Sequence, residues 1–257
     1  MITGRGEGRA AGRRGTAGEG ETGVAGSASM RRVSSVRGQC SAQAHSVPPV
    51  GDSVDETHRS DALVTGTFSN TGTASTSATG TSEFPGNSAS CTGTGTQSDT
   101  LAIEGSSLSL TFDGDTNGTA TASFNGDHGS SGGTGIGNAL ALVNFRVEGA
   151  SVPYSLQGDF SVSLGGSGSS SFNQTVDLRR RFPNGSAQFL AGFERRGDHS
   201  APVPGPHMLN QSGTLVPGKY EFFVSLGCSA HGYGTTTGSG PNANCSSNGD
   251  LTLEVGP

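Results

Sequence analysis

The sequence predicts an all-β protein: a single antiparallel β-sandwich of the Greek-key or jelly-roll kind that follows a disordered amino-terminal arm. After residue 100, apolar and polar residues alternate, which is typical of strands buried on one face. Gly, Ser and Thr make up about two-fifths of the 257 residues, and turn-forming residues recur between the apolar segments. No segment has the periodicity of an amphipathic helix, and no apolar run is long enough for a membrane-spanning helix.

The arm is predicted from the distribution of large apolar residues. Residues 1–60 contain no Leu, Phe or Tyr, and they hold eight Arg and six acidic residues among Gly, Ala and Ser. Such a composition buries too little apolar surface to offset the entropy of ordering the backbone. We therefore expect residues 1–60 to be disordered and residues 61–257 to form the sandwich, with Thr- and Gly-rich strands over 61–100. The alternative is that residues 64–100 form a floppy leader instead of edge strands. The seven basic and fifteen acidic side chains of 61–257 argue against nucleic acid as a partner.

The composition is that of an exported domain, and we expect an extracellular or cell-surface location. A signal peptide needs an apolar run after its basic start, and no such run follows Arg13-Arg14 or Arg31-Arg32. Either the protein is exported by another route, or residues 1 to about 50 are not its natural leader; we favour the second explanation.

Strand segments after residue 100 follow from the period of two. Alternating apolar residues over 108–112 and 120–124 predict a hairpin whose turn lies at the Asp-, Asn- and Gly-rich residues 113–118. Leu140 and Leu142 have one parity whereas Phe145 and Val147 have the other, which predicts a β-bulge near residues 143 and 144 if all four are buried. Further strands are expected over 101–103, 160–164, 176–178, 189–193 and 251–255.

The clearest strand covers residues 220–228, where every second residue is apolar or Cys. The preceding residues, Leu215-Val216-Pro217-Gly218-Lys219-Tyr220, have the L-x-P-G-x-Y form of a tyrosine corner. In that motif Pro217 and Gly218 shape an arch, and the Tyr220 hydroxyl bonds to backbone a few residues upstream. The alternative is an ordinary Pro-Gly turn followed by a core tyrosine. Both interpretations make Leu215, Pro217, Gly218 and Tyr220 structural.

Several motifs occur in a characteristic order after residue 100. They are the F-x-V strand Phe145–Val147, Val152-Pro153-Tyr154-Ser155-Leu156, a Gly-rich pair of strands, the segment 212–220 and the closing Leu251-Thr252-Leu253. In this order, residues 100–257 resemble the ectodomains of bacterial exported proteins that carry a PEP-CTERM sorting tail. The resemblance implies an exported sandwich and little chemistry. The chain stops at Gly256-Pro257, where such proteins continue into Pro-Glu-Pro, an apolar span and basic residues.

The four cysteines are Cys40, Cys91, Cys228 and Cys245, and they allow three pairings. No C-x-x-C occurs, which argues against a thiol-based zinc site. We favour a disulfide between Cys228 and Cys245, because it would constrain the Gly-rich segment between them. Cys40 could then pair with Cys91. The alternative is that all four are free thiols.

One segment resembles the start of a calcium-binding loop. Residues 113–118 match D-x-D-x-N-G, in which Asp113, Asp115 and Asn117 would offer oxygen ligands to a hard cation. The twelfth position is Phe124 instead of a carboxylate, so a calcium site would need Asp127 or backbone carbonyls to complete it. The alternative is a simple hairpin turn. We expect no other cofactor.

The residue pattern contains no catalytic constellation. The histidines lack the H-x-H and H-E-x-x-H spacings of zinc sites, and the G-x-S-x-G match at 129–133 lies in a Ser/Gly-rich segment with no following helix. Arg179-Arg180-Arg181 is either a polyanion contact or the charged guard of an edge strand. We expect a non-enzymatic extracellular or cell-surface protein with a structural or adhesive role, and with extracellular polysaccharide or matrix as the class of partner.

The alternative function is a carbohydrate-binding module, because sandwiches often serve that role. Sugar platforms rely on exposed aromatic faces, and this chain has no Trp. Only Tyr154 and Tyr233 remain for such a platform if Tyr220 is buried.

Overall fold

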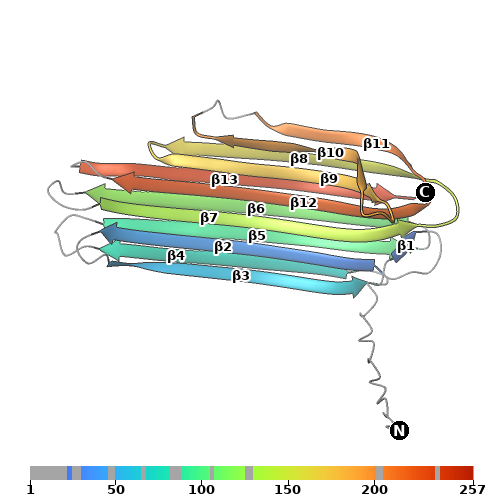
Figure 1. The fold of residues 1–257 in the computed structure, drawn as a ribbon, viewed down its shortest axis with the longest axis horizontal. Helices are drawn as coiled ribbons and strands as arrows, with labels where there is room; N and C mark the ends of the chain where they lie inside the picture. The colour runs from blue at the N-terminus through green and yellow to red at the C-terminus, as the bar shows by residue number, and fades with distance from the viewer. Residues whose placement is uncertain are drawn as a thin grey trace, which may run out of the picture.

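The computed structural model describes residues 22–24, 30–45, 50–64, 68–81, 88–104, 107–124, 130–200, 205–234 and 238–256. Side chains are described from residue 89 onward, over 89–104, 107–122, 132–200, 205–233 and 242–256. Within these ranges the protein is all-β: two sheets pack face to face, and the axes of their long strands are nearly aligned across the two layers (Figure 1). The predicted fold class, an antiparallel β-sandwich, is confirmed.

The first layer is a seven-stranded sheet in which all neighbours are antiparallel except β1, which pairs in parallel with the end of β7. From one edge to the other it contains β10 (Ala187–Asp198), β9 (Ser169–Arg181), β12 (Gly218–Gly234), β7 (Ser130–Val147), β2 (Met30–His45) and β3 (Val50–Val64), with β1 (Thr22–Val24) beside β7.

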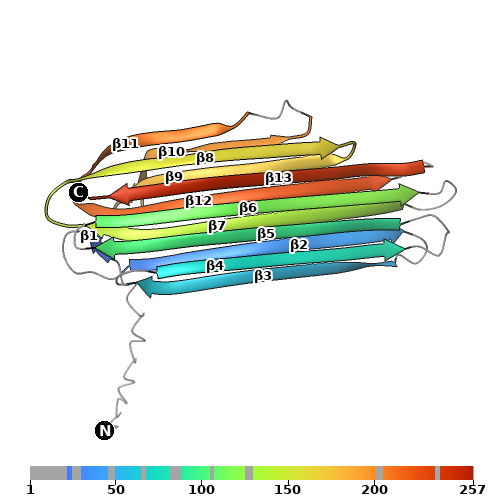
Figure 2. The ribbon, with the colours of Figure 1, turned by 180° about the vertical axis from the view of Figure 1, so that it is seen from behind.

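The second layer is a six-stranded antiparallel sheet. Its order is β11 (His207–Leu215), β8 (Val152–Gly166), β13 (Gly238–Val255), β6 (Ser107–Phe124), β5 (Ser88–Glu104) and β4 (Phe68–Thr81). Consecutive strands frequently lie in different layers, so most connections cross from one sheet to the other. In these strand orders β10 and β11 lie at one long edge of the sandwich, and β3 and β4 lie at the other (Figures 1 and 2).

The long strands divide the sandwich along their length into two halves, and one of these halves has a core of large side chains. It is built from the alternate, inward-facing residues that the period of two predicts. The largest fully buried side chains in this half are Phe112, Phe145, Phe160, Tyr220, Phe222, Leu101, Leu108, Leu110, Leu156 and Leu178. Burial of each such side chain stabilises the fold by about 1.5–3 kcal/mol, so this half supplies most of the hydrophobic stabilisation.

In the other half, which we call the thin half, the two sheets meet through Gly and Ala. A Cβ atom built on Gly135 of β7 would lie 2.0 Å from the carbonyl oxygen of Thr92 on β5. The same atom on Gly137 would lie 2.0 Å from the carbonyl oxygen of Thr94. The two backbones therefore touch without intervening side chains. The small buried side chains of this half are those of Ala89, Cys91, Ala120, Ala230 and Ala243.

The hairpin turn expected at residues 113–118 is wrong. Strand β6 runs from Ser107 to Phe124 without a break and pairs with β5 on one side and β13 on the other. Its inward positions keep a single parity, but they are small at Gly114, where a Cβ atom would meet the Phe112 ring, and at Gly118, where it would meet the Gly135 carbonyl oxygen of the facing sheet. Small inward residues between polar outward residues look like a turn in the sequence, although here they continue the strand.

The β-bulge expected near residues 143 and 144 is also wrong. The register of β7 with β12 is continuous, and Ala139, Ala141 and Val143 fill the inner face. Leu140 and Leu142 are half-buried on the outer face, where Leu142 lies directly opposite Phe223. The register instead shifts within the β9–β10 and β6–β13 pairs.

Strands begin earlier in the chain than the composition predicts. In the segment 1–60, where a disordered arm is expected, the structure has β1, β2 and most of β3. Strand β2 pairs with both β3 and β7 through its backbone, a ladder that needs no large apolar side chain. The Thr- and Gly-rich strands expected over 61–100 correspond to the end of β3, to β4 and to most of β5. Residues 1–21, 25–29 and 46–49 of the expected arm lie outside the described residues, and the domain division at residue 60 stays a prediction.

Candidate functional site

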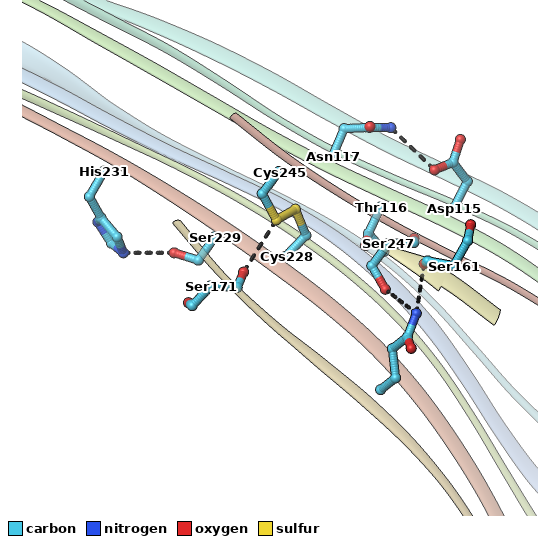
Figure 3. Close-up of a disulfide and its surroundings, with 11 residues drawn as sticks. Asp115, Thr116, Asn117, Ser161, Ser171, Cys228, Ser229, His231, Cys245 and Ser247 are labelled. Carbon is cyan, nitrogen blue, oxygen red and sulfur yellow. Dashed lines mark hydrogen bonds between the residues drawn. A yellow bond between two sulfur atoms is a disulfide. The ribbon is translucent and has the colours of Figure 1, made fainter. Parts of the chain in front are cut away.

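The calcium-loop residues lie on an open strand face instead of in a loop. Asp113, Asp115 and Asn117 are alternate residues of β6 and point to the outer face of the six-stranded sheet. Asn117 Nδ2 donates a hydrogen bond to Asp115 Oδ1 at 3.3 Å (Figure 3). Alternate residues of a strand are spaced about 7 Å apart, so these three do not converge as loop ligands do. Asp127 lies outside the described residues.

Asp113 instead belongs to a row of carboxylates that crosses three strands. It lies directly opposite Asp250 of β13, and Asp250 lies opposite Asp159 of β8. Partial burial, the charge of Asp113, a hydrogen bond with Asp113 and the charge of Asp159 together raise the pKa of Asp250 above its usual range. Among the side chains that the structure describes, no three His, Cys, Asp or Glu groups are placed to hold a metal ion. Sequence reasoning missed this row because its members are far apart in the chain.

Hydroxyl groups form cross-strand pairs on the same outer face. Ser90 Oγ lies 2.6 Å from Thr121 Oγ1, and Thr92 Oγ1 lies 2.6 Å from Thr119 Oγ1. Each pair joins residues that are directly opposite on β5 and β6. Each such hydrogen bond restrains two rotamers while leaving further donor and acceptor capacity toward solvent. We call this area the hydroxyl face; its members are Ser90, Thr92, Thr94, Thr96, Asn117, Thr119, Thr121, Asn244 and Ser246.

The favoured cysteine pair joins the two layers. Cys228 of β12 and Cys245 of β13 form a disulfide with a Cα–Cα distance of 5.8 Å, and both residues are buried between the sheets (Figure 3). Cys245 Sγ lies 3.2 Å from the Ser171 carbonyl oxygen. Cys91 is also disulfide-bonded, and its partner side chain lies outside those that the structure describes. The pairing of Cys40 with Cys91 stays a prediction.

The buried amide of Gln174 and the half-buried amide of Gln211 also cross between the layers. Gln174 of β9 donates to the Ser161 carbonyl oxygen at 2.7 Å and to Ser247 Oγ at 3.1 Å, both in the opposite sheet. At the β10–β11 edge, Gln211 Oε1 accepts from the Gly192 N–H at 2.7 Å, and its Nε2 donates to the Gly192 carbonyl at 3.3 Å. These polar groups are satisfied by backbone or hydroxyl partners, so they act as cross-links between the sheets.

The tyrosine of the expected corner has the hydrogen bond that defines the motif. Tyr220 is buried, and its hydroxyl donates to the Val216 carbonyl oxygen at 2.6 Å. Leu215 is fully buried beside this arch, and the Arg180 guanidinium donates to the Pro217 carbonyl at 2.8 Å. Leu215, Pro217, Gly218 and Tyr220 therefore stabilise the entry into β12.

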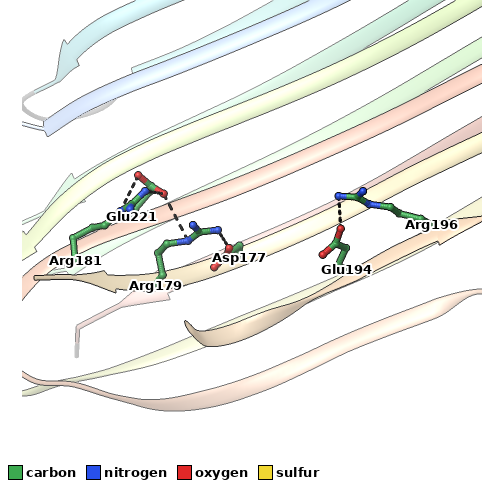
Figure 4. Close-up of polar contacts among 6 residues, drawn as sticks. All are labelled: Asp177, Arg179, Arg181, Glu194, Arg196 and Glu221. Carbon is green, nitrogen blue, oxygen red and sulfur yellow. Dashed lines mark hydrogen bonds and ion pairs between the residues drawn. The ribbon is translucent and has the colours of Figure 1, made fainter. Parts of the chain in front are cut away.

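The arginine cluster lies on an inner strand instead of an edge. Strand β9 is flanked by β10 and β12, so its arginines do not guard an edge. Arg181 Nε donates to Glu221 Oε2 at 3.2 Å, and Arg179 pairs with both Glu221 and Asp177 (Figure 4). These carboxylates neutralise two of the three arginines, which weakens the case for a polyanion contact.

A serine and a histidine meet on the outer face of the seven-stranded sheet. Ser229 Oγ lies 2.7 Å from His231 Nε2 (Figure 3), and Thr134 Oγ1 lies 2.9 Å from His231 Nδ1. A nucleophile beside a base is the start of a hydrolytic site, but here the group orienting the imidazole is a hydroxyl and all three residues lie on an open strand face. Thr134 is distant in sequence, so no spacing motif could have revealed this contact.

The described part of the chain has no helix able to span a membrane. Comparisons with protein-family models and with curated protein sequences find no match to this chain.

Proposed function

We propose that this protein is a non-enzymatic extracellular or cell-surface component with a structural or adhesive role. The observation that carries the proposal is how the interior is used: the Cys228–Cys245 disulfide and the glutamine hydrogen bonds link the two layers to each other. Such an interior leaves the broad outer faces to carry any interaction. A disulfide between buried cysteines also fits an oxidising compartment outside the cytoplasm.

Polar outer faces support the adhesive part of this proposal. The hydroxyl face presents seven hydroxyl and two amide side chains, and its cross-strand hydroxyl pairs restrain their own rotamers. Groups that are already ordered lose less entropy when they bind. A flat polar surface of this kind suits an extended partner such as a polysaccharide or matrix polymer better than a small substrate.

Fractionation of the native source tests the location. The protein is expected in the extracellular or surface fraction, with Cys228 and Cys245 joined in non-reduced peptide maps. Recovery in the cytoplasmic fraction with free thiols at both positions would contradict the proposal. The two readouts are independent, because oxidation during preparation does not move a protein between fractions.

Carbohydrate binding is the second candidate, and the exposed Tyr233 is the observation that favours it. The Tyr233 ring is 62% exposed and lies near the Ser229–His231 contact. Tyr154 is less available, because it is half-buried and packs against the core. A polysaccharide array separates the two proposals. A reproducible hit that is lost in Tyr233→Ala favours the module, whereas a blank array favours a structural component.

A further inference from the structure

Two strands at one long edge of the sandwich each have a neighbour on one side only. Among the described strands, β3 pairs only with β2 and β4 pairs only with β5. They lie above one another at the same edge of the two layers (Figures 1 and 2). An unpaired strand presents a row of free N–H and C=O groups that can pair with another chain. Strand β4 has no charged residue and no proline across its 14 residues, so its sequence contains none of the usual guards against such pairing.

The centres of β3 and β4 lie at the same level along the strands. Thr57, the middle residue of β3, is aligned through Arg37 of β2 with Asn138 of β7. The neighbouring Gly137 packs against the Thr94 carbonyl of β5, and Thr94 is paired with Ser75, near the middle of β4. One two-fold axis perpendicular to the sheets can therefore pass beside both centres.

One register of strand β3 with a second copy of itself places opposite charges together and no like charges directly opposite each other. In an antiparallel pairing centred on Thr57, Glu56 lies opposite His58 of the other copy, and Asp55 lies opposite Arg59. The two-fold axis repeats each of these pairs. The opposite charges of Asp55 and Arg59 that face each other across the strands are stabilising, and the His58 ring offers Glu56 an N–H donor.

Neighbouring registers lose this complementarity. A two-fold axis normal to the sheet does not exchange its two faces. Residues that lie opposite each other must therefore point to the same face, so the axis can pass only beside a residue and not between two residues. Centring on Glu56 places Glu56 opposite Glu56, and centring on His58 places Asp55 opposite Asp61. Like charges directly opposite each other are destabilising, so Thr57 is the favoured centre.

Strand β4 fits the same axis. In an antiparallel pairing centred on Ser75, Thr73 lies opposite Ser77 and Thr71 lies opposite Thr79. Hydroxyl residues thus meet hydroxyl residues at the odd positions, a favourable kind of cross-strand pair.

We propose that two copies of this chain associate through this edge, β3 with β3 and β4 with β4, about a single two-fold axis beside Thr57 and Ser75. Both sheets then continue across the dimer. The same surface serves both copies, so the assembly closes at two and buries the uncharged edge of β4. This inference does not depend on the proposed function.

Charge reversal tests the register on the full chain by sedimentation velocity. Asp55→Arg faces Arg59 of the other copy, and Arg59→Asp faces Asp55, so each single change turns two attractive pairs into repulsive ones. Each is expected to weaken the dimer roughly tenfold or more, and the double variant Asp55→Arg/Arg59→Asp is expected to restore it. Asp52→Arg is the matched control, because its opposite residue is Ala62 and the dimer is expected to persist.

A crosslink tests the position of the axis. Thr57→Cys places two thiols opposite each other, and a short bifunctional maleimide is expected to join the two copies. Ser53→Cys, which faces Asp61, is expected to give little crosslinked dimer. A parent chain that stays monomeric, a dimer that ignores the charge reversals, or open-ended filaments would each overturn the proposal.

Discussion

The side-chain amide of Gln97 holds both polar atoms of the Leu140 backbone across the sandwich. Gln97 Oε1 accepts from the Leu140 N–H at 3.0 Å, and Nε2 donates to the Leu140 carbonyl oxygen at 3.1 Å. Gln97 belongs to β5 and Leu140 to β7, so this contact joins the two layers where the large-residue core gives way to the thin half. The glutamine is only 2% exposed, and these two hydrogen bonds give its buried amide the partners that water supplies at the surface.

Replacing Gln97 with Met is expected to lower the free energy of unfolding by about 1–3 kcal/mol, because its hydrogen bonds to the Leu140 backbone and to Asp99 Oδ1 are lost while the side-chain length is kept. Urea unfolding measures the change. Gln157→Met on the exposed face of β8 is the control and is expected to change stability by less than about 0.5 kcal/mol. Equal effects at the two positions would show that the Gln97 contacts contribute nothing.

Replacing Tyr220 with Phe is expected to cost about 1 kcal/mol, since it removes the hydroxyl that donates to the Val216 carbonyl and leaves the ring in place. The stacking of Tyr220 on Phe145, with ring centroids 5.5 Å apart, is unaffected by the change. Tyr233→Phe is the control, because that ring is exposed. A Tyr220→Phe protein with parental stability would refute the corner.

Replacing Gly135 with Ala is expected to destabilise the protein by about 3 kcal/mol, at the upper end of overpacking effects, because the new methyl group would meet the Thr92 carbonyl oxygen. Thermal unfolding followed by circular dichroism measures the loss. Gly205→Ala is the control, since no atom lies within 4 Å of a Cβ at that position. If both variants melt with the parent, the backbones in the thin half do not touch.

Removing the inter-sheet disulfide with Cys228→Ala/Cys245→Ala is expected to cost about 3 kcal/mol, the chain-entropy value for a loop of this length. Denaturant unfolding without reductant gives the difference. Reductant is expected to destabilise the parent more than the double variant, because only the parent has this bond to lose. An equal response of the two proteins would contradict the pairing.

Replacing Asp250 with Asn is expected to stabilise the protein at pH 7 by less than about 1 kcal/mol, because it removes a largely exposed charge between Asp113 and Asp159. The folded protein raises the pKa of this carboxyl, so it binds the proton more tightly than the unfolded chain does. Parental stability therefore falls as pH rises from about 4 through the folded pKa.

The advantage of Asp250→Asn should accordingly vanish below about pH 4, where the parental carboxyl is protonated in both states. Added salt should narrow it at pH 7 by screening the row of carboxylates. A variant that is less stable than the parent at pH 7 would show that this carboxylate makes a favourable contact instead.

Sequence reasoning succeeded where large residues mark the inner face. The strand at 220–228 and the corner before it were predictable because every second residue from Tyr220 to Cys228 is apolar or Cys, and these residues are buried. Reasoning failed where the inner face is small: Gly114 and Gly118 continue β6, yet they look like turn residues. Strands β2 and β3 were missed for another reason: their placement rests on backbone pairing, which composition does not record.

Contacts between distant residues were out of reach for a different reason. The row formed by Asp113, Asp159 and Asp250 depends on strand order and register, and neither follows from the spacing of residues along the chain. The outward position of Leu140 likewise depends on which alternate set of β7 faces the other sheet. Parity alone offered two solutions, and the inserted bulge was the wrong one.

The thin half also has a thermal consequence. The heat capacity of unfolding comes mainly from hydrating apolar surface, and backbones that meet through Gly135 and Gly137 bury little of it. The protein should therefore show a heat-capacity increment below the usual value of about 12–15 cal/mol/K per residue. Its stability curve would then be flatter than that of a sandwich of equal length with a uniform core, with a gentler decline on both cooling and heating.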